Sequence, residues 1–338
     1  MRSLSLFLSL LLPSLCMAGS PRSPVRVHTS LQQREGGGFM VRRSVGSPYL
    51  TEVDPFLMLD HLGPTTYGPG EAVGAPDHPH RGFETVTYVL SGGFHHLDNS
   101  GNEGNLGPGW AQWMTAGSGV IHSEMPIDSL LRDGGDFEGF QLWVNLPAKD
   151  KMIAPRYQDT PPERIPKVTS PDGMTDIAII AGRILDTDAA IETRTPIMFF
   201  DISIKPGGRF TAPIPASHKG FVYIYRGDGT FGPDAEIARE GQFFALSDGT
   251  ELEMSASGDD ALRLLLIAGE PIGEPVFKYG PFVMNTRDEV IQAIKDYNEG
   301  RFGKQIGGAK ERMWKTEAAK EAQKGSGKWD EDTKRTEL

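Results

Sequence analysis

The sequence predicts an all-β protein made of two β-barrels or sandwiches in tandem, with a short helix near the C-terminus. The chain of 338 residues is long enough for about two domains. Its 41 glycines and 25 prolines make up about a fifth of the residues. Alternating strand patterns occur twice at a similar spacing, each closed by a glycine turn. This combination is typical of paired barrels and not of helical bundles.

Composition and charge exclude several classes of protein. Hydrophobic residues make up 38% and charged residues 23%, which is ordinary for a globular protein and too apolar for a disordered one. The formal net charge is −11 and no long Lys/Arg run occurs, so we expect no direct contact with nucleic acid. Beyond the N-terminal segment, no stretch of about 20 apolar residues occurs, so we expect no membrane span.

Residues 1–18 have the layout of a secretory signal peptide. Arg2 supplies a positive charge, residues 4–12 are Leu, Phe and Ser, and Ala18 offers a small residue for cleavage. A misassigned start codon, or a presequence for another organelle, is the alternative. Cys16, the only cysteine of the chain, would be removed with this segment. We therefore expect no disulfide and no thiolate ligand in the mature protein.

Residues 301–338 are predicted to be a charged, solvated tail with one short candidate helix near residues 311–323. The chain ends on Arg335-Thr336-Glu337-Leu338, which resembles a KDEL-type retention signal with Arg for Lys and Thr for Asp. Together with the signal peptide, this ending predicts the secretory pathway and the lumen of the endoplasmic reticulum. The cytoplasm or nucleus is the alternative if the presequence is not a signal.

The repeat divides the body of the chain into two domains. Strands over 84–92 and 109–114 form the first copy, and strands over 220–227 and 241–246 form the second. We assign residues 26–147 to the first domain and residues 196–300 to the second.

Residues 148–195 are predicted to be a linker and crossover between the domains. Proline favours an extended backbone there, at Pro155, Pro161, Pro162 and Pro166. The one clear helix begins at Thr286, because Thr286 and Glu289 form a capping box ahead of an apolar pattern, and Gly300 lies beyond its end.

Histidine spacing indicates a metal site in the first domain. His78 and His80 are two residues apart, as are His122 and Glu124, and residues i and i+2 of a strand project from one face. On neighbouring strands, the two pairs would place three imidazoles and a carboxylate around one ion. Nitrogen and oxygen ligands without thiolates suit iron, manganese, nickel, copper or zinc, and resemble an extended facial triad. A single His-x-His pair more often has no metal role; the second pair, after a glycine turn, strengthens the metal interpretation.

The remaining candidates are weaker. Glu84 has the same parity as His78 and His80, so it could be a further ligand or an outer hydrogen-bond acceptor for one of them. His95 and His96 are adjacent and point to opposite faces, so we interpret them as surface or core residues. We interpret His61 as structural. The second domain offers only an isolated His218, so we expect it to be metal-free.

Several long motifs resemble the pirin family. They are residues 54–60 (DPFLMLD), 78–88 (HPHRGFETVTY), 112–117 (QWMTAG), 122–126 (HSEMP) and 141–147 (QLWVNLP), with 267–272 (IAGEPI) and 279–283 (YGPFV) in the second half. The resemblance covers residues 26–303. It implies a bicupin, two antiparallel jelly-roll barrels facing one another. It also implies one Fe(II) ion in the first barrel, with His78, His80, His122 and Glu124 as ligands, and no site in the second.

The resemblance also implies two different functions. Some pirins resemble quercetin 2,3-dioxygenases, which would give this chain flavonol-like substrates and dioxygen, with Glu124 moving a proton as well as binding metal. Other pirins act in transcriptional regulation, where the oxidation state of the iron changes a surface that binds protein partners. A third reading is that the metal only holds the barrel together.

Overall fold

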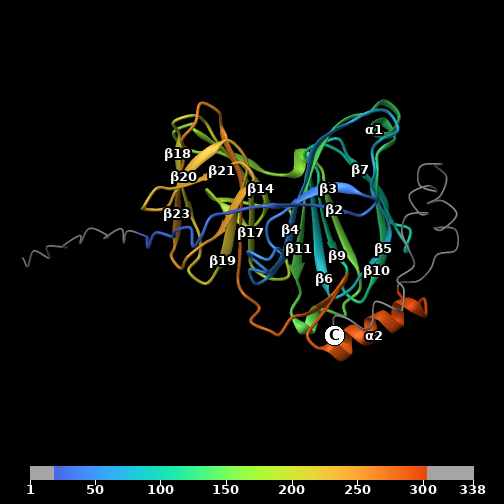
Figure 1. The fold of residues 1–338 in the computed structure, drawn as a ribbon. Coiled ribbons are helices and arrows are strands. Elements are labelled where there is room, and N and C mark those ends of the chain that lie inside the picture. Colours follow the sequence, from blue (N-terminus) through green and yellow to red (C-terminus); the bar gives the residue numbers. More distant parts are fainter. Residues whose placement is uncertain (1–18, 303–338) are drawn as a thin grey trace, which may run out of the picture.

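The computed structural model describes residues 19–302, which form two β-barrels lying side by side (Figure 1). The strand pairs that build both barrels are antiparallel. The predicted all-β bicupin is therefore confirmed. The predicted signal peptide with Cys16, the candidate helix at 311–323 and the terminal tetrapeptide all lie outside the described residues.

The N-terminal barrel is built from a seven-stranded and a four-stranded sheet within residues 19–302. In spatial order, the larger sheet contains β12 (Arg156–Thr160), β9 (Ala111–Thr115), β6 (Phe83–Ser91), β11 (Gly135–Asn145), β4 (Phe56–Tyr67), β3 (Phe39–Arg43) and β2 (Leu31–Glu35). The smaller sheet contains β5 (Ala75–His80), β10 (Val120–Pro126), β7 (Phe94–Asp98) and β8 (Glu103–Leu106).

The C-terminal barrel repeats this arrangement over the same described part of the chain. Its larger sheet contains β1 (His28–Thr29), β22 (Gln242–Ala245), β19 (Lys219–Arg226), β24 (Leu262–Gly269), β17 (Ile197–Ile204), β14 (Thr175–Ala181) and β13 (Lys167–Thr169). Its smaller sheet contains β18 (Arg209–Pro213), β23 (Glu251–Ala256), β20 (Asp228–Phe231) and β21 (Glu236–Arg239).

Shorter elements complete the fold. They are the helix α1 (Asp128–Asp133), the 3-10 turns at Ala148–Asp150 and Pro162–Arg164, and the strand pairs β15 (Arg183–Ile184) with β16 (Thr187–Asp188) and β25 (Phe277–Tyr279) with β26 (Phe282–Met284). The helix α2 (Arg287–Asn298) has Thr286 as its N-cap and the complete capping box with Glu289, which confirms the prediction. No helix within residues 19–302 is long and apolar enough to cross a lipid bilayer.

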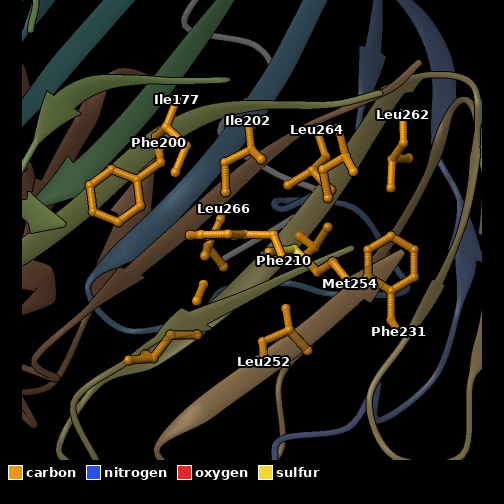
Figure 2. Packing of buried hydrophobic residues seen from close by; sticks show 14 of the residues in the cluster. Ile177, Phe200, Ile202, Phe210, Phe231, Leu252, Met254, Leu262, Leu264 and Leu266 are labelled. Atoms are coloured by element: carbon orange, nitrogen blue, oxygen red, sulfur yellow. The ribbon is translucent and has the colours of Figure 1, made fainter. Parts of the chain in front are cut away.

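The two larger sheets face each other, and each buries both of its faces. On β17, Phe200 and Ile202 point into the C-terminal barrel, whereas Phe199 points toward the N-terminal barrel. Figure 2 shows the first of these faces, where Phe200, Ile202, Leu264 and Leu266 meet Phe210, Leu252 and Met254. Burial on both faces explains why β24 is apolar after Arg263 and does not alternate with polar residues.

Each end of the described chain packs on the barrel that the other half of the sequence builds. β1 pairs with β22, and the buried Arg22 donates hydrogen bonds to the carbonyl groups of Pro215, His218 and Ser247 in the C-terminal barrel. In the opposite direction, β25, β26 and α2 lie against the N-terminal barrel, near β5 and β10 (Figure 1). The two barrels are therefore interlocked through the ends of this region.

The linker is shorter than the predicted 148–195, and the domain boundaries shift accordingly. β12 pairs with β9 of the N-terminal barrel, and β13 and β14 belong to the larger sheet of the C-terminal barrel. The direct connection is the short proline-containing segment 161–166. β12 pairs with β9 and β14 pairs with β17, and the spacing of the prolines does not reveal these pairings.

Candidate metal centre

Three imidazoles meet inside the N-terminal barrel. One ring nitrogen each of His78, His80 and His122 lies within 4.8 Å of the others, and this group can hold a metal ion. The ring centroids are 4.7 Å apart for His78 and His80, 4.3 Å for His78 and His122, and 4.9 Å for His80 and His122. His80 and His122 are buried, and His78 is half-buried.

The two strands that carry these side chains are neighbours, which is the condition under which the sequence spacing would bring the two pairs together. β5 and β10 pair antiparallel, with His122 directly opposite His78. β5 is the edge strand of its sheet, which accommodates Pro79 because an edge strand does not need every backbone N–H for pairing. The alternation along β5 then places His78 and His80 on one face.

Free ring nitrogens indicate that the group is suited to a cation. Neither ring nitrogen of His80 has a hydrogen-bond partner, nor does Nε2 of His122, although all three atoms are buried. Buried polar atoms are rarely left without a partner. Burial lowers the pKa of His80 and His122 well below the ordinary value, and neighbouring imidazoles lower it further. Both rings are therefore neutral at pH 7, with a lone pair available for a metal.

His78 is oriented by the backbone. Its Nδ1 lies 2.7 Å from the carbonyl oxygen of Pro76, and a carbonyl can only accept, so Nδ1 carries the proton. The lone pair of His78 is then on Nε2. A hydrogen bond of this kind commonly fixes the tautomer and orientation of a metal-binding histidine.

Glu124 lies two residues beyond His122 on β10, outside the group of three ring nitrogens that lie within 4.8 Å of one another, and two neighbours donate hydrogen bonds to its carboxylate. Thr87 Oγ1 donates to Oε1 over 3.0 Å, and Gln141 Nε2 donates to Oε2 over 2.9 Å. The pairing of β10 with β5 shifts in register between His122 and Glu124. Each carboxylate oxygen accepts one hydrogen bond here and retains a second lone pair.

The structure does not bring Glu84 to the three histidines. Its carboxylate accepts a 2.6 Å hydrogen bond from Thr115, on the face of β6 that also carries Val86 toward the C-terminal barrel. Thr87, which reaches Glu124, lies on the opposite face. The parity argument fails because Gly82, with a φ of +86°, separates β5 from β6 and resets the alternation.

Sequence reasoning missed His96. This buried residue lies on β7 opposite Glu124, and its Nδ1 is 3.4 Å from Nδ1 of His122. Its neighbour His95 is exposed and binds Glu103, so the predicted opposite orientation of the two is confirmed. The alternation of Phe94, His96 and Asp98 on one face of the strand was the signal that could have identified it.

His61 lies between the barrels, not in the histidine group. Its Nε2 is 2.9 Å from Glu138 Oε1 and its Nδ1 is 2.9 Å from the hydroxyl of Tyr223. The interior of the C-terminal barrel, by contrast, is filled with aliphatic and aromatic side chains over the described residues (Figure 2).

The fold and this site define a bicupin whose first barrel contains a histidine group that can hold a metal ion. A family model described as Pirin matches residues 38–144, and one described as Pirin C-terminal cupin domain matches residues 199–303. The chain therefore belongs to the pirin family.

Its relatives agree with this assignment. It is 45% identical over 284 residues to a pirin-like protein of Solanum lycopersicum, covering 84% of this chain and 94% of that protein. It is 42% identical over 288 residues to pirin of Homo sapiens, covering 84% and 95%. Among solved structures, it is similar to a quercetin 2,3-dioxygenase from Acinetobacter baumannii, with a TM-score of 0.78 and 34% identity over 83% of this chain and 98% of that one. A bacterial pirin from Escherichia coli, solved in complex with nickel(II), has a similar fold at 20% identity, with a TM-score of 0.55 over 73% of this chain and 99% of that one.

Proposed function

We propose that this chain is a metal-dependent dioxygenase of the quercetin 2,3-dioxygenase type, acting on flavonol-like substrates. The observation that carries the proposal is the group of three imidazoles with free buried nitrogens in the N-terminal barrel. The similarity to the quercetin 2,3-dioxygenase from Acinetobacter baumannii supports the reaction type.

The residues that would hold the metal are His78, His80, His122 and Glu124. A bound Fe(II) would supply Lewis acidity toward a substrate hydroxyl oxygen and one-electron redox chemistry toward dioxygen. Three imidazoles and one carboxylate fit this hard-to-borderline cation, which takes nitrogen and oxygen ligands.

Glu124 would also hold the proton that the substrate hydroxyl loses. Thr87 and Gln141 each donate to one of its oxygens, which fixes the plane of the carboxylate. One remaining lone pair of the carboxylate can bind the metal, and another can accept the proton. A carboxylate fixed in this way is a suitable general base, because a general base must first lie within hydrogen-bond reach of the proton that it accepts.

Two side chains near His80 suit an aromatic, anionic ligand: Trp143, which contacts the His80 ring, and Lys278, which lies over the Trp143 indole. The ring of Trp143 is half-buried and lies 5.4 Å from the His80 ring. Lys278 Nζ lies 5.0 Å from the centroid of the same indole. We propose that an aromatic substrate packs near Trp143, with the Lys278 ammonium close to its phenolate oxygens.

The decisive experiment is aerobic turnover of a flavonol by iron-loaded protein, followed by loss of flavonol absorbance and by oxygen consumption. We expect turnover in the wild type and none in His122→Ala. Glu124→Gln keeps the size of the side chain but replaces one acceptor oxygen with an amide donor and removes the charge, so we expect it to bind the metal more weakly through the three histidines and to lose turnover. His95→Gln is the matched control, since this exposed histidine lies on the other face of β7.

Iron bound at one ion per chain without turnover of any flavonol would contradict the proposal. That result would favour the alternative, a metal-dependent binding protein with protein partners. Stoichiometric iron in a His78→Ala, His122→Ala double variant would contradict the ligand assignment itself.

We also propose that the protein enters the secretory pathway, with residues 1–18 as its signal peptide. The apolar run at 4–12, Ala18 and the terminal Arg335-Thr336-Glu337-Leu338 support this. N-terminal sequencing of protein expressed in a eukaryotic host should find Gly19 first. A chain that keeps residues 1–18 and stains the cytoplasm or nucleus would contradict the proposal.

A further inference from the structure

His96 is a buried histidine that the proposed ligand set does not use. β7 pairs antiparallel with β10, which places His96 opposite Glu124 and Asp98 opposite His122. The His96 and His122 rings are 5.2 Å apart at their centroids, and their Nδ1 atoms are 3.4 Å apart. His96 is 1% exposed, so water does not compete for this contact.

Two facing imidazole nitrogens can share only one proton. Two N–H groups would repel each other, as would two lone pairs, so one Nδ1 donates and the other accepts. Nε2 of His122 is buried without a partner, and Nδ1 is occupied by the contact with His96. The lone pair that His122 can offer to a metal is therefore on Nε2, which leaves the proton on its Nδ1.

We infer that His96 is a positioning residue for the metal centre: its Nδ1 accepts the Nδ1–H of His122 and fixes Nε2 of that ring toward His78 and His80. Pro76 has the same role for His78, where the acceptor is a carbonyl oxygen. His80 has no such partner on either nitrogen, and Nε2 of His96, which carries the proton when Nδ1 accepts, is also buried without a hydrogen-bond partner among the described residues. The inference rests on the proposed metal site but not on the proposed reaction.

The test compares two substitutions of His96, one that leaves a hydrogen-bond acceptor for His122 and one that does not. Asn places an amide oxygen near the position of the imidazole Nδ1, whereas Leu places no acceptor there. We expect His96→Leu to weaken Zn(II) and Fe(II) affinity about 10- to 100-fold in a chelator competition, as outer hydrogen-bond partners of metal ligands commonly do. His96→Asn should restore most of the affinity. His95→Leu, one residue away on the exposed face, should leave it unchanged.

Nuclear magnetic resonance of the Zn(II)-loaded, histidine-labelled protein supplies a readout independent of turnover. We expect the His122 Nδ1–H to be protected from exchange in the wild type and in His96→Asn, and exposed to exchange in His96→Leu. A wild-type His122 with its proton on Nε2 would overturn the inference, and this measurement needs no variant to fold. Equal affinity of folded His96→Leu and wild type would also overturn it.

The outcomes separate the inference from the proposed function. Absent turnover with His96-dependent affinity would reject the dioxygenase and keep the positioning role. Failure of the wild type to bind either metal would reject the metal site and the inference with it.

Discussion

Tyr88 of the N-terminal barrel donates a 2.9 Å hydrogen bond to Asp201 of the C-terminal barrel. Asp201 also accepts from Tyr225, and the guanidinium of Arg263 lies 3.8 Å away. Burial raises the pKa of the Asp201 carboxyl, while these donors and the nearby arginine act in the opposite direction. The interface between the barrels thus contains a buried acid whose partners come from both sides, which favours one orientation of the barrels over others.

Replacing Tyr88 with Phe should destabilise the protein by about 1–3 kcal/mol, because a buried carboxyl loses one of its donors. Urea unfolding of the metal-free protein measures this loss. A double-mutant cycle with Asp201→Asn isolates the coupling between the two residues. A cycle with no coupling energy would show that the hydrogen bond does not stabilise the interface.

Acid should destabilise the metal-free protein below about pH 6.5, the ordinary pKa of histidine. Burial lowers the pKa of His61, His80, His96 and His122. The unfolded chain therefore binds more protons than the folded one in this range, and stability is complete above the unfolded pKa and is lost as the pH falls. Each such histidine contributes a slope of up to about 1.4 kcal/mol per pH unit.

The contribution of a single histidine to this pH dependence can be measured at His61. Burial is the main cause of its lowered pKa; the contact with Glu138 acts in the opposite direction, and Arg42 and Arg226 lower the pKa slightly further. Urea unfolding between pH 7.5 and 5.5 should give a shallower pH dependence for His61→Gln than for the wild type. An identical slope in the two proteins would contradict the assignment.

Asp296 of α2 forms an ion pair with Arg81, the residue that follows His80. Arg81 Nη1 donates to Asp296 over 2.7 Å, Nε donates to the carbonyl of Ser118, and the guanidinium lies over the Phe302 ring. Asp296→Asn should cost about 1.5–3 kcal/mol, the range for a hydrogen bond to a charged group, and should speed metal release to a chelator.

The exposed pair of Arg301 and Glu299 is the control for this prediction. Its side chains are about half exposed, so Glu299→Gln should change stability by less than about 1 kcal/mol. Equal losses of stability in Asp296→Asn and Glu299→Gln would show that the contact of Asp296 with Arg81 stabilises the protein no more than an exposed ion pair does.

Gly82 should not tolerate a side chain. A Cβ there would lie 2.0 Å from the carbonyl oxygen of Val283, and the φ of +86° is unfavourable for alanine. Gly173 has a similar φ of +71° but open space around it, so Gly173→Ala should cost about 1–2 kcal/mol. Gly82→Ala should cost more and reduce metal content, because the corner between β5 and β6 must move. Unfolding and metal analysis of both variants test this.

Lys278→Met should raise the KM for flavonols up to about fivefold with little change in kcat, as expected for the loss of one partly exposed charge. Initial rates measured across flavonol concentrations give both constants. Lys219→Met, which removes an exposed lysine that binds Asp248 on the C-terminal barrel, is the control. A change confined to kcat would place Lys278 in a different role.

The histidine pairs could be predicted because the direction of side chains along a strand depends only on local sequence. The shared face of His78 and His80 follows from their spacing alone, whereas the pairing of their strand with that of His122 is supplied by the fold. The capping box at Thr286 is equally local. Glu84 was different, because the alternation does not continue through the turn at Gly82.

The partners of Glu124 and His122 could not be predicted from spacing. Thr87, Gln141 and His96 lie on three other strands, and only the register of the closed barrel brings them to the site. The same limit applies to residues 148–195, where β12 pairs with β9 and β14 pairs with β17, both outside this segment.

The interlocked ends of residues 19–302 also determine when the protein can fold during synthesis. β1 is synthesised well before its partner β22, and Arg22 well before the carbonyl groups that it binds in the C-terminal barrel, so both remain unpaired until the second half of the chain has been made. Arg81, which follows β5 and its two histidines, is made early and gains its ion-pair partner Asp296 only when α2 has been made. Long-range contacts of this kind slow folding, and each half of the chain completes its packing only after the other half has been made. Either barrel made alone would therefore expose a surface that the other half now covers.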